Sequence, residues 1–456
     1  MSDTIAAIAT GQGRSAIGIL RISGPEARQV LVRVFTPVGK TPLLERPAGT
    51  LVYGSLRQAD GTLLDRCMAT FSVAPHSYTG EDTAELQCHG SPAVLTAGLE
   101  ALFAAGARQA RAGEFTRRAF LNGKLDLTQA EAVIDLIDAE TASAAVNAAG
   151  QLSGALRRRI EGIYDALLDL MAHYHVVLDY PDEDIDPFEL NEISRTVSDA
   201  LRDLRALAAS YRRGRRLTEG VPTALIGPPN AGKSSLLNAL LGYDRAIVTP
   251  VPGTTRDTVE ETCVVGGTLL RLVDTAGIRE ARDQVEQLGV ARSRAALERA
   301  ELILAVVDGS APLTPEAQAL LEGLPEGKPC VVVVNKCDLP SAVSCTSFPQ
   351  KFAQVCAVSA RTGEGLEALE GCISALLAEG EAPPAGELIT NARQAEAISR
   401  AADCLEAVGQ ALAGGMPPDC VLTDVEGALY ALGEVTGGTV TEDVTDRIFS
   451  RFCVGK

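Results

Sequence analysis

Residues 227–234 read G-P-P-N-A-G-K-S and lie between an apolar stretch and a leucine-rich one. The spacing G-x-x-x-x-G-K-S is typical of a phosphate-binding loop, in which glycines let successive backbone N–H groups point at phosphate oxygens. In such a loop Lys233 reaches the β- and γ-phosphates, Ser234 binds Mg2+, and the following helix adds the positive end of its dipole. The sequence therefore predicts a nucleotide site, whose base must be inferred from other residues.

The base is indicated by N-K-C-D at residues 335–338, which follows the apolar run 331–334. A carboxylate on Asp338 accepts hydrogen bonds from both N1–H and the exocyclic amino group of guanine, whereas adenine offers neither donor in that geometry. The tripeptide S-A-R at residues 359–361 fits the further loop that backs the base through main-chain N–H groups. We therefore expect a guanine nucleotide.

Two further segments fit the γ-phosphate side of such a site. D-T-A-G at residues 274–277 closes the apolar run 269–273, which predicts Asp274 near the Mg2+ water shell and the Gly277 amide near the γ-phosphate. G-T-T-R-D at residues 253–257 lies where a switch loop should supply a threonine hydroxyl to Mg2+, and we choose Thr255.

Hydrolysis needs a group that orients the attacking water. Ras-like enzymes place a glutamine directly after the glycine of D-x-x-G, but this chain has Ile278, which cannot hydrogen-bond water. Residue chemistry alone does not choose among the charged residues that follow, each of which also fits a solvated helix face: Arg279, Glu280, Arg282, Asp283 and Glu286.

The elements that must position these residues divide the chain into parts. Residues 1–120 mix short β-rich runs with a helical pattern, as in a compact α+β domain. Residues 121–220 are helical, and D-L-T-Q at 126–129 has capping-box spacing before apolar residues at helical spacing, namely Ala130, Val133, Ile134 and Ile137. Strands and helices alternate over 221–380, and 381–456 returns to helical patterning. The fold class predicted is a multidomain α/β protein: an N-terminal α+β domain and a discontinuous helical domain with an inserted Ras-like, parallel-sheet P-loop GTPase domain.

Charge and cysteine usage narrow the function classes. The 41 basic and 59 acidic residues give a net charge of −18, which argues against a broad basic nucleic-acid surface and leaves local clusters at 157–159 and 212–216. Such clusters also occur on solvated helix faces. The 11 cysteines include no C-x-x-C pair, so neither zinc nor a disulfide framework is indicated. Apolar runs are of strand length and no basic segment opens the chain, so we expect a cytoplasmic protein without a membrane segment.

The whole chain resembles the bacterial tRNA modification GTPase family MnmE, also called TrmE. Nucleotide motifs recur in many GTPases, so the specific resemblance depends on stretches near both ends of the chain. These are I-L-R-I-S-G at 19–24, Y-T-G-E-D at 78–82, G-E-F-T-R-R-A-F-L-N-G-K at 113–124, L-D-L-T-Q-A-E-A at 125–132 and F-C-V-G-K at 452–456. The family pattern at the C-terminus is F-C-I-G-K, so Val454 differs from it by one methylene.

This resemblance implies a K+-activated GTP hydrolase that modifies C5 of the wobble uridine of certain tRNAs to (carboxymethyl)aminomethyluridine. The one-carbon donor would be 5,10-methylenetetrahydrofolate or 5-formyltetrahydrofolate, bound by an N-terminal domain that also mediates homodimerisation. FAD is expected only on a partner subunit, with which the homodimer forms a heterotetramer or a larger assembly. The phosphate-loop domains of two chains would meet during hydrolysis, with Mg2+ and K+ at the nucleotide.

The resemblance also assigns roles to single residues. Ser234 and Thr255 match the Mg2+ ligands, and Glu286 matches the glutamate that positions the water. The K+ ligands are matched by Asn230, Thr249, Val251 and Thr254. The folate-contacting positions are matched by Arg21, Glu85, Lys124 and Lys456. The GTP-binding positions are matched by Asn230, Ala231, Gly232, Lys233, Ser234, Ser235, Thr249, Pro250, Val251, Pro252, Gly253, Thr254, Thr255, Asp274, Thr275, Ala276, Gly277, Asn335, Lys336, Asp338, Ser359 and Ala360.

Cys453 allows two interpretations. A thiol beside Lys456 becomes a nucleophile for uracil C6 if its pKa is lowered. Alternatively it is a small apolar residue buried in a terminal helix, because cysteine is among the most buried residue types. The sequence leaves both open.

Two other functions remain as rivals. One is a ribosome-assembly GTPase switch that binds RNA without modifying it, and the other is a folate-dependent enzyme that uses GTP only as a regulatory ligand. Switches of the first kind usually carry an RNA-binding module or a second phosphate loop. This chain has one G-x-x-x-x-G-K-S loop and no G-x-x-G clamp in a KH context.

Overall fold

A computed structural model describes residues 3–11, 13–179, 190–243, 261–273, 297–344, 348, 352, 354–377, 384–416, 421–450 and 452–455. The chain forms two compact units. The first comprises residues 1–134, 152–193 and 410–456, and the second comprises residues 135–151 and 194–409. Each unit is therefore built from segments that lie far apart in the sequence.

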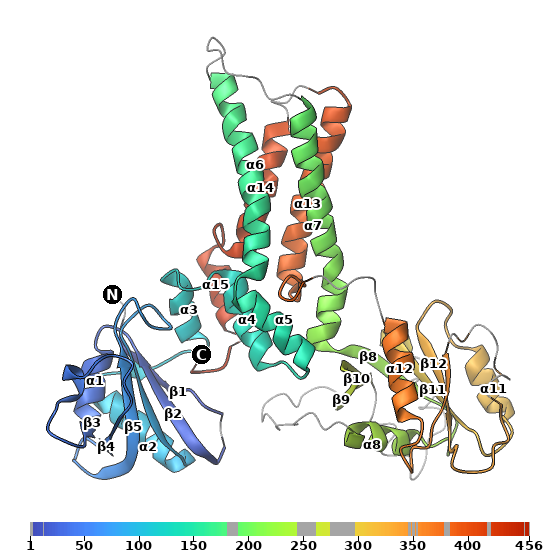
Figure 1. Ribbon diagram of the computed structural model, residues 1–456, viewed down its shortest axis with the longest axis horizontal. Coiled ribbons are helices and arrows are strands. Elements are labelled where there is room, and N and C mark those ends of the chain that lie inside the picture. The colour runs from blue at the N-terminus through green and yellow to red at the C-terminus, as the bar shows by residue number, and fades with distance from the viewer. Residues whose placement is uncertain are drawn as a thin grey trace. The chain divides into compact units, whose positions relative to one another are not determined.

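The first unit opens with a seven-stranded sheet (Figure 1), whose strand order is β3-β4-β5-β6-β2-β1-β7. Most neighbouring strands are antiparallel, and the short pair β1 and β7 is parallel. The strands are β1 (Ile5–Ile8), β2 (Ser15–Ser23), β3 (Phe35–Pro37), β4 (Val52–Arg57), β5 (Leu63–Ser72), β6 (Thr83–Gly90) and β7 (Arg108–Gln109). The register pairs Arg21 of β2 with Glu85 of β6, which places these two predicted site residues side by side.

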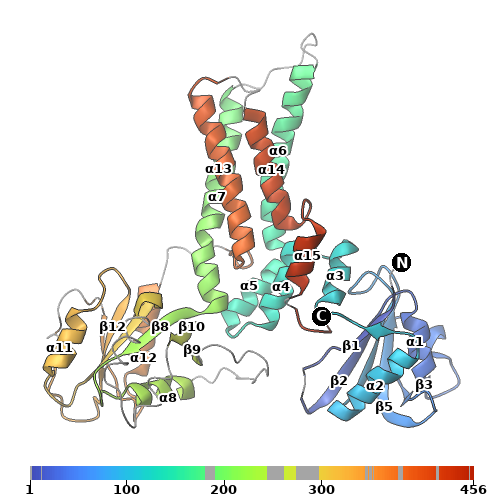
Figure 2. The same cartoon turned by 180° about the vertical axis from the view of Figure 1, so that it is seen from behind.

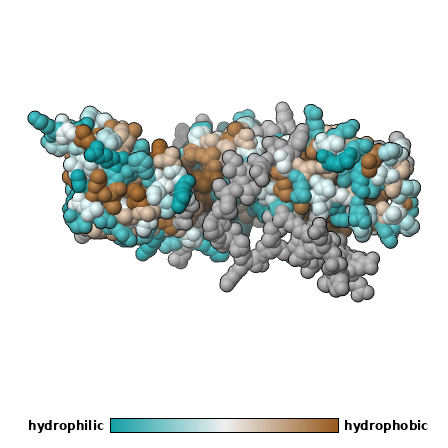
Figure 3. All heavy atoms as spheres, turned by 90° about the horizontal axis from the view of Figure 1, so that it is seen from below, coloured by the Kyte–Doolittle hydropathy of each residue, from teal (hydrophilic) through white to brown (hydrophobic). Residues whose placement is uncertain are grey.

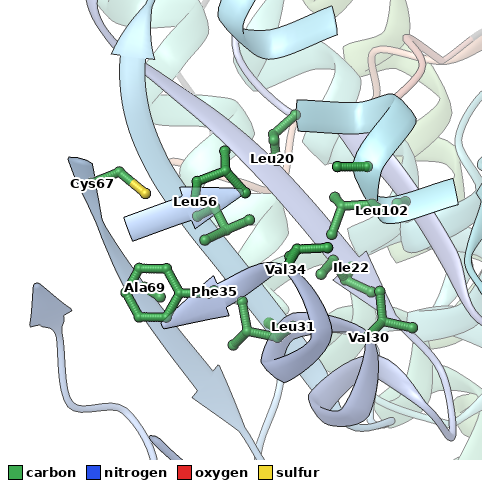
Figure 4. Close-up of a cluster of buried hydrophobic side chains, with 14 of the residues drawn as sticks. Leu20, Ile22, Val30, Leu31, Val34, Phe35, Leu56, Cys67, Ala69 and Leu102 are labelled. Atoms are coloured by element: carbon green, nitrogen blue, oxygen red, sulfur yellow. The ribbon is translucent and has the colours of Figure 1, made fainter. Parts of the chain in front are cut away.

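One face of this sheet packs against the helices α1 (Ala27–Val34) and α2 (Pro92–Ala104). The strand β2 alternates between buried and less buried residues toward its end, so Leu20 and Ile22 point into the core. Figure 4 shows both in one cluster with Leu31 of α1 and Leu102 of α2. A 3-10 turn, η1 (Leu43–Glu45), adds Leu43 to the same cluster. This core holds β2 and β6 rigidly, and with them the residues on their other face.

The remaining helices of the first unit are α3 (Glu114–Leu121), α4 (Leu127–Ile137), α6 (Ala155–Asp179), α14 (Leu422–Thr436) and α15 (Glu442–Phe449). The capping box is confirmed, because the Gln129 N–H donates to Asp126 Oδ1 over 2.8 Å and the Asp126 N–H donates to Gln129 Oε1 over 3.0 Å. The predicted apolar face is wrong at its last position, since Ile137 is 47% exposed. Ala130 and Val133 instead pack in one cluster with Phe449 and Phe452.

The second unit contains the helices α5 (Ala142–Leu152), α7 (Leu190–Glu219) and α13 (Ala392–Ala413). The helices α7 and α13 run side by side in both views (Figures 1 and 2). Arg205 of α7 forms ion pairs with Asp403 and Glu406 of α13. The helices of this unit thus come from both sides of the segment 221–377, as the sequence predicts for an inserted domain.

That inserted segment, here called the phosphate-loop domain (residues 221–377), forms a six-stranded sheet of order β13-β12-β11-β8-β10-β9. All neighbouring strands are parallel except β9 with β10. The strands are β8 (Val221–Ile226), β9 (Glu261–Val265), β10 (Thr268–Val273), β11 (Leu302–Asp308), β12 (Cys330–Asn335) and β13 (Gln354–Ala357). The helices α8 (Lys233–Tyr243) and α12 (Leu366–Leu377) pack in one core cluster with the sheet, and α11 (Pro315–Glu322) packs in the other.

The predicted fold class is therefore confirmed, from the N-terminal α+β region to the inserted parallel sheet. The predicted domain boundaries stay predictions. No helix among the described residues combines the length and the apolar character that crossing a bilayer requires.

Candidate functional site

The phosphate loop connects β8 to α8 at the carboxyl ends of the central strands. Asn230 has a φ of +63° and Gly232 a φ of +92°, so the loop turns through left-handed backbone twice. Asparagine tolerates this region, while glycine adopts it without steric cost. A Cβ on Gly232 would also lie 2.2 Å from Asn335 Nδ2, so this position has no room for a side chain.

Lys233 begins α8 and folds back over its own loop. Its ammonium donates to the carbonyl oxygens of Gly227 over 2.7 Å and of Pro228 over 2.9 Å. Burial lowers the pKa of Lys233. An ammonium held this way across the curl of the loop is placed to attract phosphate oxygens, because it remains a donor of a third hydrogen bond.

Asn335 joins the phosphate loop to the two segments that should read the base. Its Nδ2 donates to the Ala231 carbonyl over 3.0 Å, and its Oδ1 accepts from the N–H groups of Lys336 over 2.9 Å and of Ala360 over 3.0 Å. The side chain is buried, with Asn335 only 2% exposed. One amide therefore fixes three backbone segments that are remote in sequence.

Lys336 itself has a φ of +69°, and its ammonium pairs with Asp308 Oδ2 over 2.5 Å. Asp308 ends β11 and also accepts from the Ser310 N–H and hydroxyl. Burial would raise the pKa of this carboxyl, but the hydrogen bonds from Lys336 and Ser310 outweigh it and lower the pKa. The lysine stem is thereby held over the same edge of the sheet as Asn335.

Asp338 carries the carboxylate that should recognise guanine. Its Oδ1 accepts from the Ser359 hydroxyl over 2.6 Å, and its Oδ2 forms an ion pair with Arg361 Nη2 over 2.6 Å. The Ser359 hydrogen bond and the nearby Arg361 charge lower the pKa of Asp338, so the carboxylate stays ionised. The sequence placed Arg361 in the S-A-R loop but did not assign it to the site. The structure shows its exposed side chain as the ion-pair partner of Asp338.

A cavity of about 590 Å³ opens between these segments. The structure thus brings together predicted GTP-binding residues from the phosphate loop, from N-K-x-D and from the S-A-R loop. Those that line the cavity are Gly232, Ser235, Asn335, Lys336, Asp338 and Ala360. The predicted switch residues 249–255, the motif 274–277, Glu286 and Lys456 lie outside the described residues.

A second group of predicted residues gathers on the N-terminal sheet. Arg21 Nε forms an ion pair with Glu85 Oε1 over 2.9 Å. The Arg21 guanidinium also lies 5.7 Å from the ring centre of Tyr78 and 5.8 Å from that of Phe115. Two rings and a carboxylate therefore surround one guanidinium, a group that suits recognition of a planar or anionic ligand.

The loop that carries Tyr78 also meets Lys124. A Cβ on Gly80 would lie 3.2 Å from Lys124 Cγ, and Asn122 Nδ2 donates to the Thr79 carbonyl over 2.7 Å. Lys124 thus lies at the loop whose Tyr78 touches Arg21. The structure places Arg21, Glu85 and Lys124 in one region of the first unit.

The C-terminal segment docks at the same place. Val454 forms a β-bridge with Ala112, and the Gly455 carbonyl accepts from Arg21 Nη1 at 3.5 Å. Cys453 is exposed and follows the end of α15 at Phe449. The interpretation of Cys453 as a residue buried in a terminal helix is therefore wrong. Cys453 lies beyond the end of α15, in the C-terminal segment whose Val454 pairs with Ala112.

Next to this region lies a partly buried ionic network that the sequence did not reveal. Arg118 donates to Glu81 over 2.9 Å and to Glu114 over 3.0 Å, while Arg108 pairs with Glu114 over 2.6 Å and with Asp3. Burial alone would raise the pKa of Glu114, but the hydrogen bonds from Arg108, Arg118 and the Arg111 N–H hold it at about 2. The spacing of Glu114 and Arg118 was the available signal, since residues four apart share a helix face.

The two basic clusters are engaged within the fold. Arg157 pairs with Glu161 and Asp126, and Arg215 and Arg216 both pair with Glu301. Arg157 therefore forms the kind of contact expected for a solvated helix face, whereas Arg215 and Arg216 pair with a residue of the phosphate-loop domain. Among the described residues the cysteines are free thiols, and no cluster of His, Cys, Asp or Glu has a metal-binding arrangement.

Comparison with known proteins gives two family matches that together cover most of the chain. Residues 127–453 match the family model described as the MnmE helical domain, and residues 4–124 match the one described as the GTP-binding protein TrmE N-terminus. The second match contains Arg21, Glu85 and Lys124. The first spans the phosphate loop and the base-reading segments.

Full-length relatives agree with these matches. The chain is 46% identical over 456 residues to the tRNA modification GTPase MnmE of Symbiobacterium thermophilum, covering 100% of this chain and 99% of that protein. It is 45% identical over 459 residues to that of Chloroflexus aurantiacus, covering 100% of both. Among solved structures, the G domain of the T. maritima FeoB iron transporter is 27% identical with a TM-score of 0.27, covering 34% of this chain and 98% of that one.

Proposed function

Because the chain belongs to the MnmE family of tRNA modification GTPases, we propose that it hydrolyses GTP to drive modification of C5 of the wobble uridine in certain tRNAs. The product would be (carboxymethyl)aminomethyluridine. The chain would act in the cytoplasm as a homodimer, together with an FAD-dependent partner subunit in a heterotetramer or larger assembly.

The observation that carries the GTPase part is the arrangement of Asp338, Asn335 and Gly232 around one cavity, with Lys233 directly following Gly232 in the phosphate loop. Asp338 presents an ionised carboxylate where a guanine edge would lie, and Asn335 ties that base-reading segment to the phosphate loop. Lys233 and the exposed Ser234 at the start of α8 would bind the phosphates and Mg2+ respectively. A ligand that has both a guanine and a phosphate chain fits these two ends.

K+ activation is the part of the proposal that rests on Asn230. This residue is exposed on the phosphate loop and has left-handed backbone, so its amide oxygen is open to a cation. Asn230, Thr249, Val251 and Thr254 would ligate K+ with oxygen atoms. A cation there would supply fixed positive charge against the β- and γ-phosphates, where charge grows during hydrolysis. Glu286 would orient the water in place of the missing glutamine.

The folate part rests on the Arg21 region. Arg21, Glu85, Lys124 and Lys456 would bind 5,10-methylenetetrahydrofolate or 5-formyltetrahydrofolate. The guanidinium that lies near two aromatic rings and the nearby Lys124 suit a ligand with a planar ring system and carboxylates. The C-terminal segment that docks against Ala112 leaves the Cys453 thiol exposed beside this region, where it would attack uracil C6.

Homodimerisation would use the N-terminal sheet. Its strands and connecting loops expose large hydrophobic side chains, among them Ile17 at 59%, Leu51 at 50% and Tyr53 at 46%. Figure 3 shows one face of the molecule, on which hydrophobic residues, in brown, lie among hydrophilic ones. Association of two chains through this sheet would remove such exposed hydrophobic side chains from water.

The deciding experiment is nucleoside mass spectrometry of tRNA from cells that lack this protein, with and without its return. We expect the modified wobble uridine to disappear in its absence and to reappear with the wild-type chain. An unaltered nucleoside profile would contradict the proposal. If ribosomal subunits accumulated as precursors instead, the protein would act as an assembly switch.

A further inference from the structure

The phosphate-loop domain is connected to its helical neighbours at the last turns of α7. The chain enters the domain where α7 ends at Glu219, and it returns through residues 384–391 to α13. Both crossings lie against the same short stretch of α7, residues 210–216. The contacts at the entering crossing differ from those at the returning crossing. Together they restrict the motion of the phosphate-loop domain relative to α7.

The returning segment is packed closely onto α7. The Ile389 N–H donates to Ser210 Oγ over 3.2 Å, and a Cβ on Gly214 would lie 2.0 Å from the Ile389 carbonyl oxygen. The same segment is also fixed to α5, since Gln151 Nε2 donates to the Leu388 carbonyl over 2.6 Å and Asn147 Oδ1 accepts from the Gly386 N–H over 3.0 Å. This crossing is thus held by backbone as well as by side chains.

The entering side is held by one carboxylate between two adjacent arginines, here called the Glu301 clamp (Arg215, Arg216 and Glu301). Arg215 Nη2 donates to Glu301 Oε1, and Arg216 Nε donates to Oε2 over 2.9 Å. The Glu301 N–H donates to the carbonyl of Pro222, the second residue of β8, over 2.7 Å. A single residue of the phosphate-loop domain therefore contacts both the end of α7 and the first strand after it.

Burial makes this clamp stiffer than an ordinary surface ion pair. The side chains of Arg216 and Glu301 are 10% and 18% exposed. Burial would raise the pKa of Glu301, but the Arg216 hydrogen bond and the Arg216, Arg215 and Arg212 charges lower it, so the carboxylate stays ionised. Removing Glu301 would take a shared carboxylate from two adjacent arginines, of which Arg216 is mostly buried, and loss of a partner from a buried ion pair is costly.

Glu301 directly precedes β11, whose other end lies at the nucleotide site. Asp308, the last residue of β11, pairs with Lys336, and the Gly309 N–H donates to the Asn335 carbonyl over 2.8 Å. Parallel hydrogen bonding to both β8 and β12 keeps this strand rigid along its length. The clamp is therefore joined through one buried strand to the residues that should read guanine.

We propose that Glu301 is a positioning residue that couples the nucleotide site to α7, so that the phosphate-loop domain and α7 move as one body. With 30 residues, α7 is about 45 Å long, so a small rotation of the domain becomes a large displacement at the far end of the helix. This coupling role rests on the proposed function, because it explains how GTP hydrolysis drives chemistry on tRNA elsewhere in the chain.

The structural part is tested by pulsed electron paramagnetic resonance in the full chain. Nitroxide labels carried by unnatural amino acids replace the exposed residues Ala206 of α7 and Ala319 of α11. We expect one narrow distance distribution in the parent chain and at least a twofold wider one in Glu301→Ala. Glu301→Gln, which keeps the shape of the side chain and loses its charge, should give an intermediate width. An unchanged width in Glu301→Ala would overturn the proposal.

The matched control is Glu406→Ala, which removes an exposed ion pair between Arg205 of the same helix and α13. We expect this variant to keep the narrow distribution. If it widened the distribution as much as Glu301→Ala does, the specific role of the Glu301 clamp would be refuted.

The functional part compares GTP turnover with wobble-uridine modification in the same variants. We expect Glu301→Ala to keep GTP turnover within twofold and to lose modification at least tenfold. Equal losses of both activities, or full modification despite a widened distance distribution, would overturn the coupling role. Absence of modification with the wild-type chain would instead refute the proposed function, while the distance measurement would still decide whether Glu301 fixes α7.

Discussion

Asn335→Ala removes a side chain that joins the phosphate loop to both base-reading segments. The substitution deletes the donor to the Ala231 carbonyl and the acceptor of the Lys336 and Ala360 N–H groups. It leaves the strand β12 and its neighbours in place, because the residues that precede position 335 carry the packing. The effect should therefore be local to the cavity.

The size of the effect depends on how far the three backbone groups that lose their hydrogen-bond partner are buried. A buried group left without a partner costs about 1–3 kcal/mol, and an ordinary hydrogen bond contributes about 1 kcal/mol. Ala231 is 1% exposed, so its carbonyl should bear the full cost, while Lys336 and Ala360 line the cavity, where water can replace the amide. The costs of losing neighbouring hydrogen bonds do not simply add. We therefore expect the site segments to be destabilised locally by about 3 kcal/mol, so that they open about 100-fold more often.

The assay is amide hydrogen exchange of the full chain, read by mass spectrometry over residues 228–236, 335–339 and 359–364. Exchange at these segments should accelerate about 100-fold, and GDP affinity should fall by a similar factor because the two ends of the site are no longer joined. Asn238→Ala is the matched control, since Asn238 lines the same cavity and is exposed. Its apo exchange pattern should match that of the wild type.

Unchanged exchange at residues 359–364 in Asn335→Ala would refute this reasoning, because the Ala360 N–H would then not depend on the Asn335 amide. Faster exchange with unchanged GDP affinity would refute the link between loop positioning and nucleotide binding. An equal effect of Asn238→Ala would mean that any truncation in the cavity loosens the site.

Other substitutions test the remaining chemistry. Asp338→Asn should weaken GTP binding by about 100-fold through loss of charge-assisted hydrogen bonds and improve binding of xanthosine triphosphate, as measured by competition with a fluorescent GDP analogue. Glu286→Ala should keep GTP binding and lose turnover, and the wild-type turnover should be high in K+ and low in Na+ if Asn230 belongs to a cation site. Cys453→Ser should abolish tRNA modification, and full modification by this variant would exclude a nucleophilic thiol. Glu114→Gln should lower stability by about 3 kcal/mol at pH 7. Because the folded pKa of Glu114 is about 2 against an ordinary 4.5, this difference should shrink from pH 4.5 downward in urea unfolding.

Much of the nucleotide site could be predicted because its residues are local in sequence. The loop 227–234 and the motif 335–338 each follow a buried parallel strand, and parallel strands bring their carboxyl ends to one edge of a sheet. Spacing within each motif therefore sufficed to expect Lys233, Asn335 and Asp338 near one another. The capping box at Asp126 was predictable for the same reason, since its partners lie three residues apart.

Contacts between distant segments could not be predicted from spacing. Arg361 pairs with Asp338 through a loop conformation, and Glu301 meets Arg215 only because β11 runs beside β8 and begins near the end of α7. The docking of Val454 on Ala112 is a similar case, and with it the structure excludes one of the two interpretations of Cys453, that of a residue buried in a terminal helix. The periodicity of the sequence does not indicate which distant residue a charged or small residue will contact.

The sequence by itself determined the fold class, the guanine-type site and the family, because short motifs and strand patterns encode backbone geometry and hydrogen-bonding chemistry locally. Only the tertiary structure shows that Asn335 hydrogen-bonds to three backbone segments and that Arg215 and Arg216 both pair with Glu301. It also shows that the C-terminal segment contacts Arg21. The physical reason is that each of these contacts closes a long loop. Its partners are set by how whole elements pack, which no local stretch of residues specifies.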